Sequence, residues 1–333
     1  AAANLPLPRP TRAAGADAVP IVRPMTRFAA LLLTAAVLAP GSLRAAAPAP
    51  VAQSQTGFPT PEDAATALFA ALLSGQAWEI EAVIGPGGVG LLGSGDKPSD
   101  QDNLHHFIEA YADRHHIAHD GDDRAVLVIG ARDWPLPIPL VRDGTGWHFD
   151  TAGAARQIAD RRIGRNEIGA IRGLLALAGA QRAFHDAADG PHAYALKLVS
   201  AHGQQDGLYW PDSANQPRSP LADLADTARA RGYPLSPAEV PDSYGGYRLR
   251  LLTAAGPGAP GGARSFLADE RLTGGFAYLA WPVRYGSTGL MTFLLGPDGT
   301  LFQKNLGPRT DEAADAMRSY DPDLTWTLVR VAE

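Results

Sequence analysis

The chain has 333 residues, and its 29 basic and 35 acidic side chains give a formal charge of −6. It contains no cysteine, which excludes disulfides, thiolate metal sites and cysteine nucleophiles. The charge pattern argues against a nucleic-acid binder, because phosphate contacts require clustered Lys and Arg. At roughly 150 residues per domain, the length predicts two domains. The apolar content of 45% is ample for packed cores.

The first 47 residues have the organisation of a secretory signal. Residues 1–24 are rich in Ala and Pro and lack an apolar period, so we expect a non-native or disordered extension there. Arg27 precedes an apolar run at 28–39 that is followed by small residues, which predicts a signal peptide at 25–47 with cleavage after Ala47. A membrane span needs roughly 20 apolar residues, so we expect no stable membrane anchor after cleavage. The predicted location is periplasmic or extracellular.

A linker at 48–57 leads into a predicted α+β domain at 58–150. Thr60 is the expected cap of a helix that starts at Pro61 and extends to about Leu73. Further helices are expected near 78–84 and 99–116, followed by strands at 125–129, 135–141 and 146–150. Three helices followed by a small antiparallel sheet resemble the cone-shaped fold of the nuclear-transport-factor-like superfamily.

A second α+β domain is predicted at 151–333. A long helix from Thr151 to about Asp186 is followed by a strand at 194–198 and a helix within 219–233. Strands are expected at 247–252, 276–282 and 290–295, with a hairpin turn at Asp298-Gly299 leading into 300–303. This order resembles the globular domain of type IV pilins and type II secretion pseudopilins. The membrane-embedded first half of a pilin helix and a prepilin cleavage context are absent.

The stretch from Phe58 to the C-terminus resembles an exported bacterial family catalogued only as domain of unknown function 2950. The blocks that carry the resemblance include FPTPEDAATALFAAL, RRIGRNEIGAI, DGLYWP, LTGGFAYLAWPVRYGSTGLMTF and QKNLGP. The resemblance implies export and brings no catalytic residues, because the family has no assigned activity. Two loops depart from the expected pattern: a more polar residue is usual at 244–245, and a tight Asn-Gly-like turn is usual at 268–270.

Neither a metal site nor a catalytic group stands out. Five of the nine histidines lie between His105 and His119. If the third helix continues, His115 and His119 share a face, and Asp122 or Asp123 could add a ligand to a metal site; a solvated helix end is the default interpretation. Ser94 and Ser287 lie between glycines but lack the full spacing of a nucleophile elbow. We expect no catalytic residue, no metal and no cofactor.

Four residues are candidates for a binding surface. Tyr209 and Trp210 follow Asp206, and an acid beside aromatic rings is typical of sugar sites; packing in a core is, however, the usual role of large aromatics and is favoured for these two. Arg284 and Tyr285 are expected on a loop that ends a strand, where functional residues tend to lie.

The sequence therefore predicts an exported cell-envelope protein that acts by binding or assembly without catalysis. Residues 1–47 hold five arginines and one aspartate, so the mature chain carries a formal charge of −10, which favours a protein or glycan partner over an anionic lipid surface. The alternative is an envelope hydrolase or small-ligand protein with a pocket in the first domain. A first domain filled by Phe107, Trp134, Trp147 and Phe149 would favour the binding module.

Overall fold

The computed structural model describes residues 55–187 and 192–330. The predicted extension, the signal peptide and most of the linker lie outside these residues. Within them, no helix is both long enough and apolar enough to span a membrane. All of them belong to one compact unit, Val51–Glu333.

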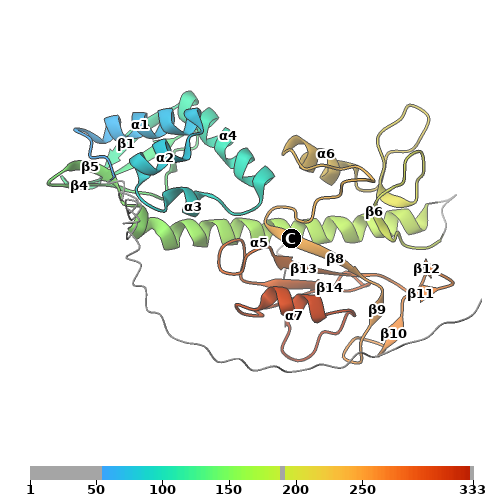
Figure 1. The fold of residues 1–333 in the computed structure, drawn as a ribbon. Coiled ribbons are helices and arrows are strands. Elements are labelled where there is room, and N and C mark those ends of the chain that lie inside the picture. Colours follow the sequence, from blue (N-terminus) through green and yellow to red (C-terminus); the bar gives the residue numbers. More distant parts are fainter. Residues whose placement is uncertain (1–54, 188–191, 331–333) are drawn as a thin grey trace, which may run out of the picture. The chain divides into compact units, whose positions relative to one another are not determined.

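Four helices open the described part, as Figure 1 shows. They are α1 (Pro61–Ser74), α2 (Ala77–Ile84), α3 (Gly88–Leu92) and α4 (Lys97–Asp113). The predicted start of α1 is confirmed: Thr60 Oγ1 accepts a hydrogen bond of 3.1 Å from the Asp63 N–H, and Pro61 occupies the first turn. The short helix α3 was not predicted, because its glycines suggested only a helix stop.

The first sheet is antiparallel, and its first strand begins within residues 99–116, where a helix was expected. Its strands are β1 (His115–His119), β2 (Arg124–Ile129), β3 (Trp134–Pro135), β4 (Leu140–Asp143) and β5 (Gly146–Phe149), in the order β1-β2-β4-β5 with β3 beside β2. Helix α4 ends at Asp113 because the backbone is already extended at Arg114, and His115 pairs with Ile129 of β2. Four strand residues span about 13 Å, so His115 and His119 are too far apart to share a metal ion. The described residues contain no cluster of His, Asp and Glu that could hold one.

A helix of 36 residues, α5 (Thr151–Asp186), follows this sheet, as predicted. The side chain of Asp150 caps it by accepting a hydrogen bond from the Gly153 N–H at 2.9 Å. Its first turns pack Ala154 and Ile158 into the hydrophobic cluster that contains α1 and β5. Its later turns pack Leu174 and Leu177 into a second, larger cluster. The division into two domains at residue 150 stays a prediction.

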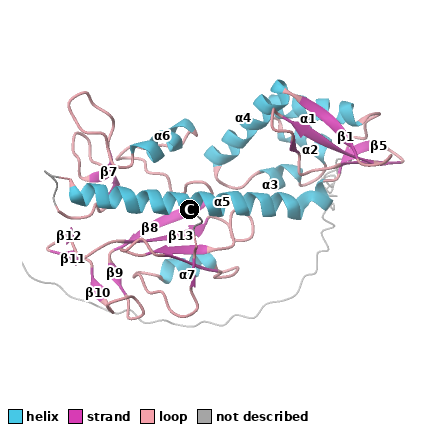
Figure 2. Cartoon of the chain, turned by 180° about the vertical axis from the view of Figure 1, so that it is seen from behind, coloured by secondary structure: helices cyan, strands magenta, loops and turns pink. Residues whose placement is uncertain are grey.

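The larger cluster surrounds a five-stranded antiparallel sheet in the order β16-β15-β14-β13-β8. In Figures 1 and 2 this sheet lies between α5 and α7, which explains why all six residues of β13 are buried. Among the described residues, no strand pairs with the outer side of β8, which is therefore the edge strand of this sheet. The sheet and its α7 comprise β8 (Tyr247–Leu252), β13 (Ala277–Pro282), β14 (Thr292–Leu295), β15 (Leu301–Lys304), α7 (Thr310–Ala316) and β16 (Thr327–Leu328).

Smaller elements complete the described chain. A parallel pair and a helix precede β8, and two short hairpins lie between β8 and β13. These are β6 (Lys197–Val199), β7 (Gly207–Tyr209), α6 (Ala222–Ala230), β9 (Ala254–Ala255), β10 (Arg264–Ser265), β11 (Leu267–Ala268) and β12 (Arg271–Leu272). With its helices and mainly antiparallel sheets, the described chain is of the predicted α+β class.

Candidate functional site

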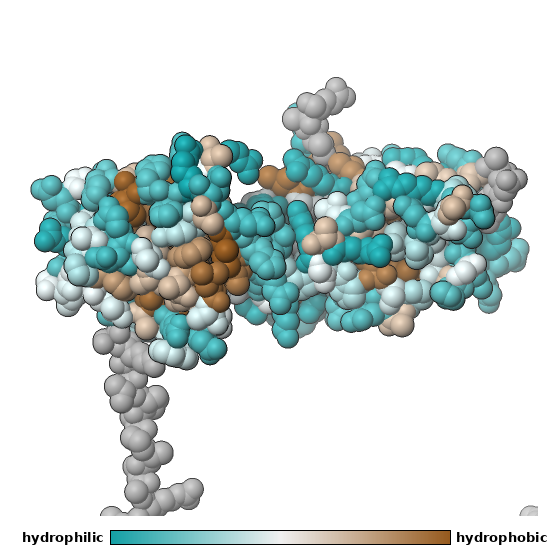
Figure 3. All heavy atoms as spheres, turned by 90° about the horizontal axis from the view of Figure 1, so that it is seen from above, coloured by the Kyte–Doolittle hydropathy of each residue, from teal (hydrophilic) through white to brown (hydrophobic). Residues whose placement is uncertain are grey.

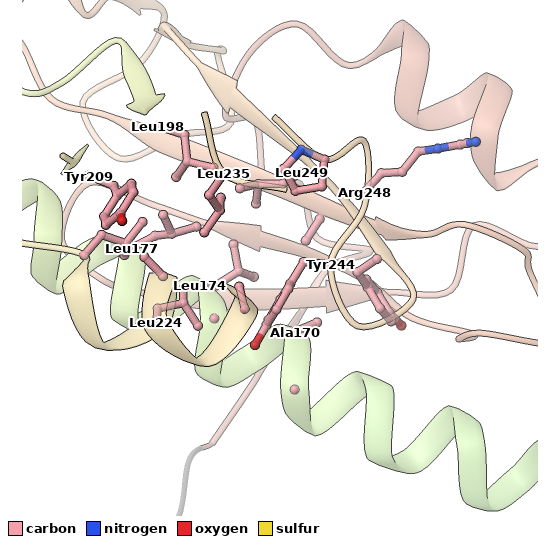
Figure 4. Close-up of a pocket in the computed structure, with 18 of the residues that line it drawn as sticks. Ala170, Leu174, Leu177, Leu198, Tyr209, Leu224, Leu235, Tyr244, Arg248 and Leu249 are labelled. Carbon is pink, nitrogen blue, oxygen red and sulfur yellow. The ribbon is translucent and has the colours of Figure 1, made fainter. Parts of the chain in front are cut away.

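A cavity of about 90 Å³ lies among α5, α6 and the edge strand β8. Figure 4 shows aliphatic side chains converging on it, among them Leu174 and Leu177 of α5, Leu224 of α6, and Leu235 from the loop after α6. The guanidinium of Arg248 extends away from it, so the stem of that residue and not its charge contributes to the wall. An apolar cavity of this kind favours the entry of an aliphatic group.

Small residues on α5 create the space. Gly169, Ala170 and Gly173 line one side, and a Cβ placed on either glycine would meet no atom within 4 Å. Leu174 and Leu177, which are almost fully buried, form the floor on the next turns of the same helix. Apart from proline, glycine is the residue least favourable to a helix interior, so Gly169 and Gly173 weaken α5 at this point. Because glycine has no side chain, the two residues also leave a hollow on the surface of the helix.

Exposed apolar side chains occur in and next to the segments that line the cavity. Leu249 of β8 lines it and is 38% exposed. Val240 and Ile168, which are 43% and 52% exposed, directly precede the lining residues Pro241 and Gly169. Figure 3 shows that hydrophobic side chains on the face seen from above gather in patches among hydrophilic ones. Exposed apolar residues beside an apolar cavity are typical of a surface that binds another molecule.

One tyrosine presents a free hydroxyl at this site. Tyr209 accepts a hydrogen bond from Arg229 at 2.8 Å, and Tyr247 donates one to the Met291 carbonyl at 2.9 Å. The Tyr244 hydroxyl makes no hydrogen bond within the described residues, and burial raises the pKa of its phenol. Tyr244 is therefore an uncharged donor that a bound molecule can use.

A buried carboxylate holds the Tyr244 loop in place. Asp96 is 2% exposed; its Oδ2 accepts hydrogen bonds of 2.8 Å from the Gly246 N–H and 2.9 Å from the Tyr233 hydroxyl. The Tyr233 ring packs on the Tyr244 ring with centroids 4.9 Å apart. These contacts connect the loop before α4 to the start of β8 and fix one wall of the cavity.

The two glycines of this loop are needed for its turn. Tyr244 and Tyr247 exchange backbone hydrogen bonds of 2.8 and 3.1 Å, which closes a two-residue turn with φ of 59° at Gly245 and 82° at Gly246. Such turns require positive φ at both positions. A Cβ on Gly246 would also approach Asn166 Nδ2 to 2.5 Å, so a larger residue would push α5 and β8 apart.

Tyr209 and Trp210 do not lie on an exposed surface but pack in a core, the arrangement that is usual for large aromatic side chains. They are 3% and 7% exposed and belong to the larger hydrophobic cluster, where the Trp210 indole donates to the Pro217 carbonyl at 2.9 Å. Tyr209 lines the cavity from within. Asp206 turns away to Lys197, and this hydrogen bond holds the pKa of its carboxyl below the ordinary value. A carboxyl that stays ionised is a poor general acid.

Arg284 and Tyr285 lie at a different place from Tyr209. They line a pocket of about 280 Å³ together with Thr310 and Asp311 at the start of α7. Asp311 Oδ1 is already engaged by Arg248 at 2.6 Å and by the Trp281 indole at 2.9 Å. The structure thus separates the four candidates into two groups, and a role in binding for them stays a prediction.

The serines considered as nucleophiles have other partners. The Ser94 hydroxyl donates to Asp100 at 2.6 Å and helps to close the turn before α4. Ser287 Oγ accepts from Arg162 at 3.4 Å. Neither serine contacts a histidine within the described residues, so neither has the base that activates a serine nucleophile.

The interior of the first α+β region is filled mainly by apolar side chains. Trp147 and Phe149 are 5% and 0% exposed, as expected, and Phe107 packs against the same cluster. Trp134 does not contribute to this interior: it is 45% exposed, and the Arg161 guanidinium lies 5.6 Å from its ring centre.

Sequence reasoning missed the cavity on α5. The spacing of Gly169 and Gly173, one helical turn apart in a long helix, is the signal that could have indicated it. The aliphatic lining itself is indistinguishable from a core in the sequence, because α6, β8 and α5 meet only in the folded chain.

Comparison with protein-family models gives a match over residues 55–329 to the family described as Protein of unknown function (DUF2950). The chain belongs to this family, as its sequence blocks indicated. Comparisons with curated proteins and with solved structures found no match.

Proposed function

We propose that this member of the family is an exported cell-envelope protein that binds a partner polypeptide without catalysis, and that its cavity accepts an aliphatic side chain of the partner. The cavity carries the proposal: it is lined mainly by Leu, Ala and Gly residues, and the exposed Leu249 lies at it. A glycan is less well matched, because sugar hydroxyls need several polar partners, whereas this lining is mainly aliphatic beside the Tyr244 hydroxyl.

The size of the cavity supports a side chain as its occupant. Drug-sized ligands and cofactors occupy pockets of about 300–1,000 Å³, and an apolar cavity of about 150 Å³ holds a benzene molecule. A cavity of about 90 Å³ is smaller than either. A leucine-sized group fits that space, whereas a long acyl chain does not.

The export pathway and the finer architecture belong to the same proposal. A signal peptide at 25–47 would deliver the chain to the periplasm or the exterior, and N-terminal sequencing of the exported protein tests its cleavage after Ala47. We further propose a cone-shaped first domain at 58–150 and a pilin-like second domain at 151–333. The order of a long helix and an antiparallel sheet supports the second likeness.

The binding proposal is tested by calorimetric titration of the full chain with two small probes, N-acetyl-leucine N′-methylamide and N-acetyl-alanine N′-methylamide. Burial of the larger side chain favours the leucine probe by about 2 kcal/mol, roughly thirtyfold in affinity. The variant Gly173→Leu fills the cavity and should lose this preference. The matched variant Gly179→Leu places the same side chain on an exposed position of α5 and should keep it. Equal affinities for the two probes, or a preference that survives in Gly173→Leu, would contradict the proposal.

A further inference from the structure

The outer edge of β8 has backbone groups without partners. The N–H and C=O groups of Tyr247 form hydrogen bonds with Tyr244 on the side of the strand away from β13. On the side that faces β13, the Gly246 carbonyl accepts a hydrogen bond from the Val283 N–H. Backbone groups alternate between the two sides of a strand, so those of Leu249 and Leu251 point outward, as Tyr247's do. Within the described residues they make no hydrogen bond.

The charged side chains of β8 do not protect its outer edge, because they point toward α7. Charged side chains commonly prevent the pairing of exposed edges. In β8 the charged residues are Arg248 and Arg250, and both reach α7, where they bond Asp311 and Asp315 at 2.6 Å. The Arg250 guanidinium also lies 4.8 Å from the centre of the Trp281 ring. The alternate residues of the strand are leucines, and Leu249 lines the cavity.

Edge and cavity therefore lie side by side on one strand. A strand added to β8 would alternate its side chains above and below the sheet, and those on the α5 side would face the cavity. The free hydroxyl of Tyr244 stands at the start of β8 as a donor to a backbone carbonyl of such a strand.

We propose that β8 binds an extended segment of another polypeptide as an additional strand, with one leucine-like side chain of that segment in the cavity. This inference rests on the proposed function and adds the form of the partner. An extended chain is the occupant because it alone supplies backbone donors and acceptors to the outward groups of Leu249 and Leu251 together with a side chain of the required size.

The test uses the pentapeptide TVLVT with an acetylated N-terminus and an amidated C-terminus. A fluorescently labelled TVLVT peptide is bound to the full chain, and unlabelled peptides are titrated as competitors. Fluorescence polarisation of the labelled peptide reports how tightly each competitor binds. Two further peptides each carry one N-methyl group, at the third and at the fourth residue. Adjacent N–H groups of a strand point to opposite edges, so only one methyl group meets β8. That peptide should bind about tenfold or more weakly, and the other should bind as the parent does.

Equal binding of both methylated peptides, or equal loss from both, would overturn the inference. The peptide TVAVT separates this failure from that of the proposed function. If TVLVT binds more tightly than TVAVT but methylation has no positional effect, the cavity is used and the edge is not. Equal binding of TVLVT and TVAVT would remove the cavity as well. If the chain self-associates and TVLVT reverses this association, a second copy of the chain occupies the edge of β8. That result would also overturn the proposal that the partner is a different polypeptide.

Discussion

The glycines of α5 allow the role of the cavity to be separated from the stability of the helix. Gly164, Gly169, Gly173 and Gly179 lie inside this helix, and a Cβ on each would meet no atom within 4 Å. Only Gly169 and Gly173 line the cavity. Replacing either pair with alanine therefore makes the same chemical change at two different places.

Both pairs should stabilise the protein to the same extent. An alanine is favoured over a glycine by about 0.8–1 kcal/mol in a helix interior, so each double variant should gain about 2 kcal/mol in the free energy of unfolding. For a chain of this size, that gain corresponds to an increase of about 3–4 °C in Tm. Urea unfolding and differential scanning calorimetry measure the two quantities.

Binding should distinguish the two pairs. Two added methyl groups would take up space in the cavity on the side that Gly169 and Gly173 line. The Gly169→Ala/Gly173→Ala variant should therefore bind the leucine probe about tenfold or more weakly, whereas Gly164→Ala/Gly179→Ala should bind it as the parent chain does. The reasoning is refuted if the first variant binds the probe normally, or if it is less stable than the parent.

Three further predictions concern stability. The variant Asp96→Ala leaves the buried Tyr233 hydroxyl and Gly246 N–H without their carboxylate acceptor. It should lower the free energy of unfolding, measured in urea, by about 2–4 kcal/mol. A decrease no greater than that of the exposed control variant Asp122→Ala would contradict this prediction. Burial raises the pKa of Tyr320 to about 12, against about 10 for an unfolded tyrosine, so above pH 10 only the unfolded state releases the proton and stability should fall as pH rises. Constant free energies of unfolding between pH 9 and pH 11.5 would be incompatible with that shift, and burial of Tyr233, Tyr244, Tyr247 and Tyr278 raises their pKa values and acts in the same direction. Glu270 adopts a left-handed conformation with φ of 61° in the β11–β12 turn, so Glu270→Gly should remove backbone strain and raise the free energy of unfolding by about 0.5–1 kcal/mol. A lower Tm for this variant would exclude strain at this residue.

Patterns that depend on neighbouring residues predicted their elements well. Residues 247–252 and the cap at Thr60 were found as expected, because alternation of side chains and capping are local properties. The expected helix over 99–116 failed at Arg114, where pairing of β1 with β2 overrides helix propensity. The turn at 268–270 is tight even without the expected Asn-Gly, because Asp269 and Glu270 both adopt positive φ.

The candidate site depended on contacts that no local pattern contains. Burial of Tyr209, the last residue of β7, follows from its packing against α5 and α6, whereas its sequence is equally compatible with an exposed aromatic. The bond between Asp96 and Gly246 joins residues 150 positions apart. Composition could predict a protein without cysteine chemistry, but only the fold brings the glycines of α5 next to the open edge of β8.

The most direct test of the central claim is methyl NMR of the isotope-labelled full chain during titration with N-acetyl-leucine N′-methylamide. Binding in the cavity predicts saturable shifts of the Leu174 and Leu177 methyl signals, while Leu127 and Leu140 in the other hydrophobic clusters stay unchanged. Leu174 and Leu177 signals that do not move at saturating probe, or that move no more than those of Leu127 and Leu140, would contradict the account.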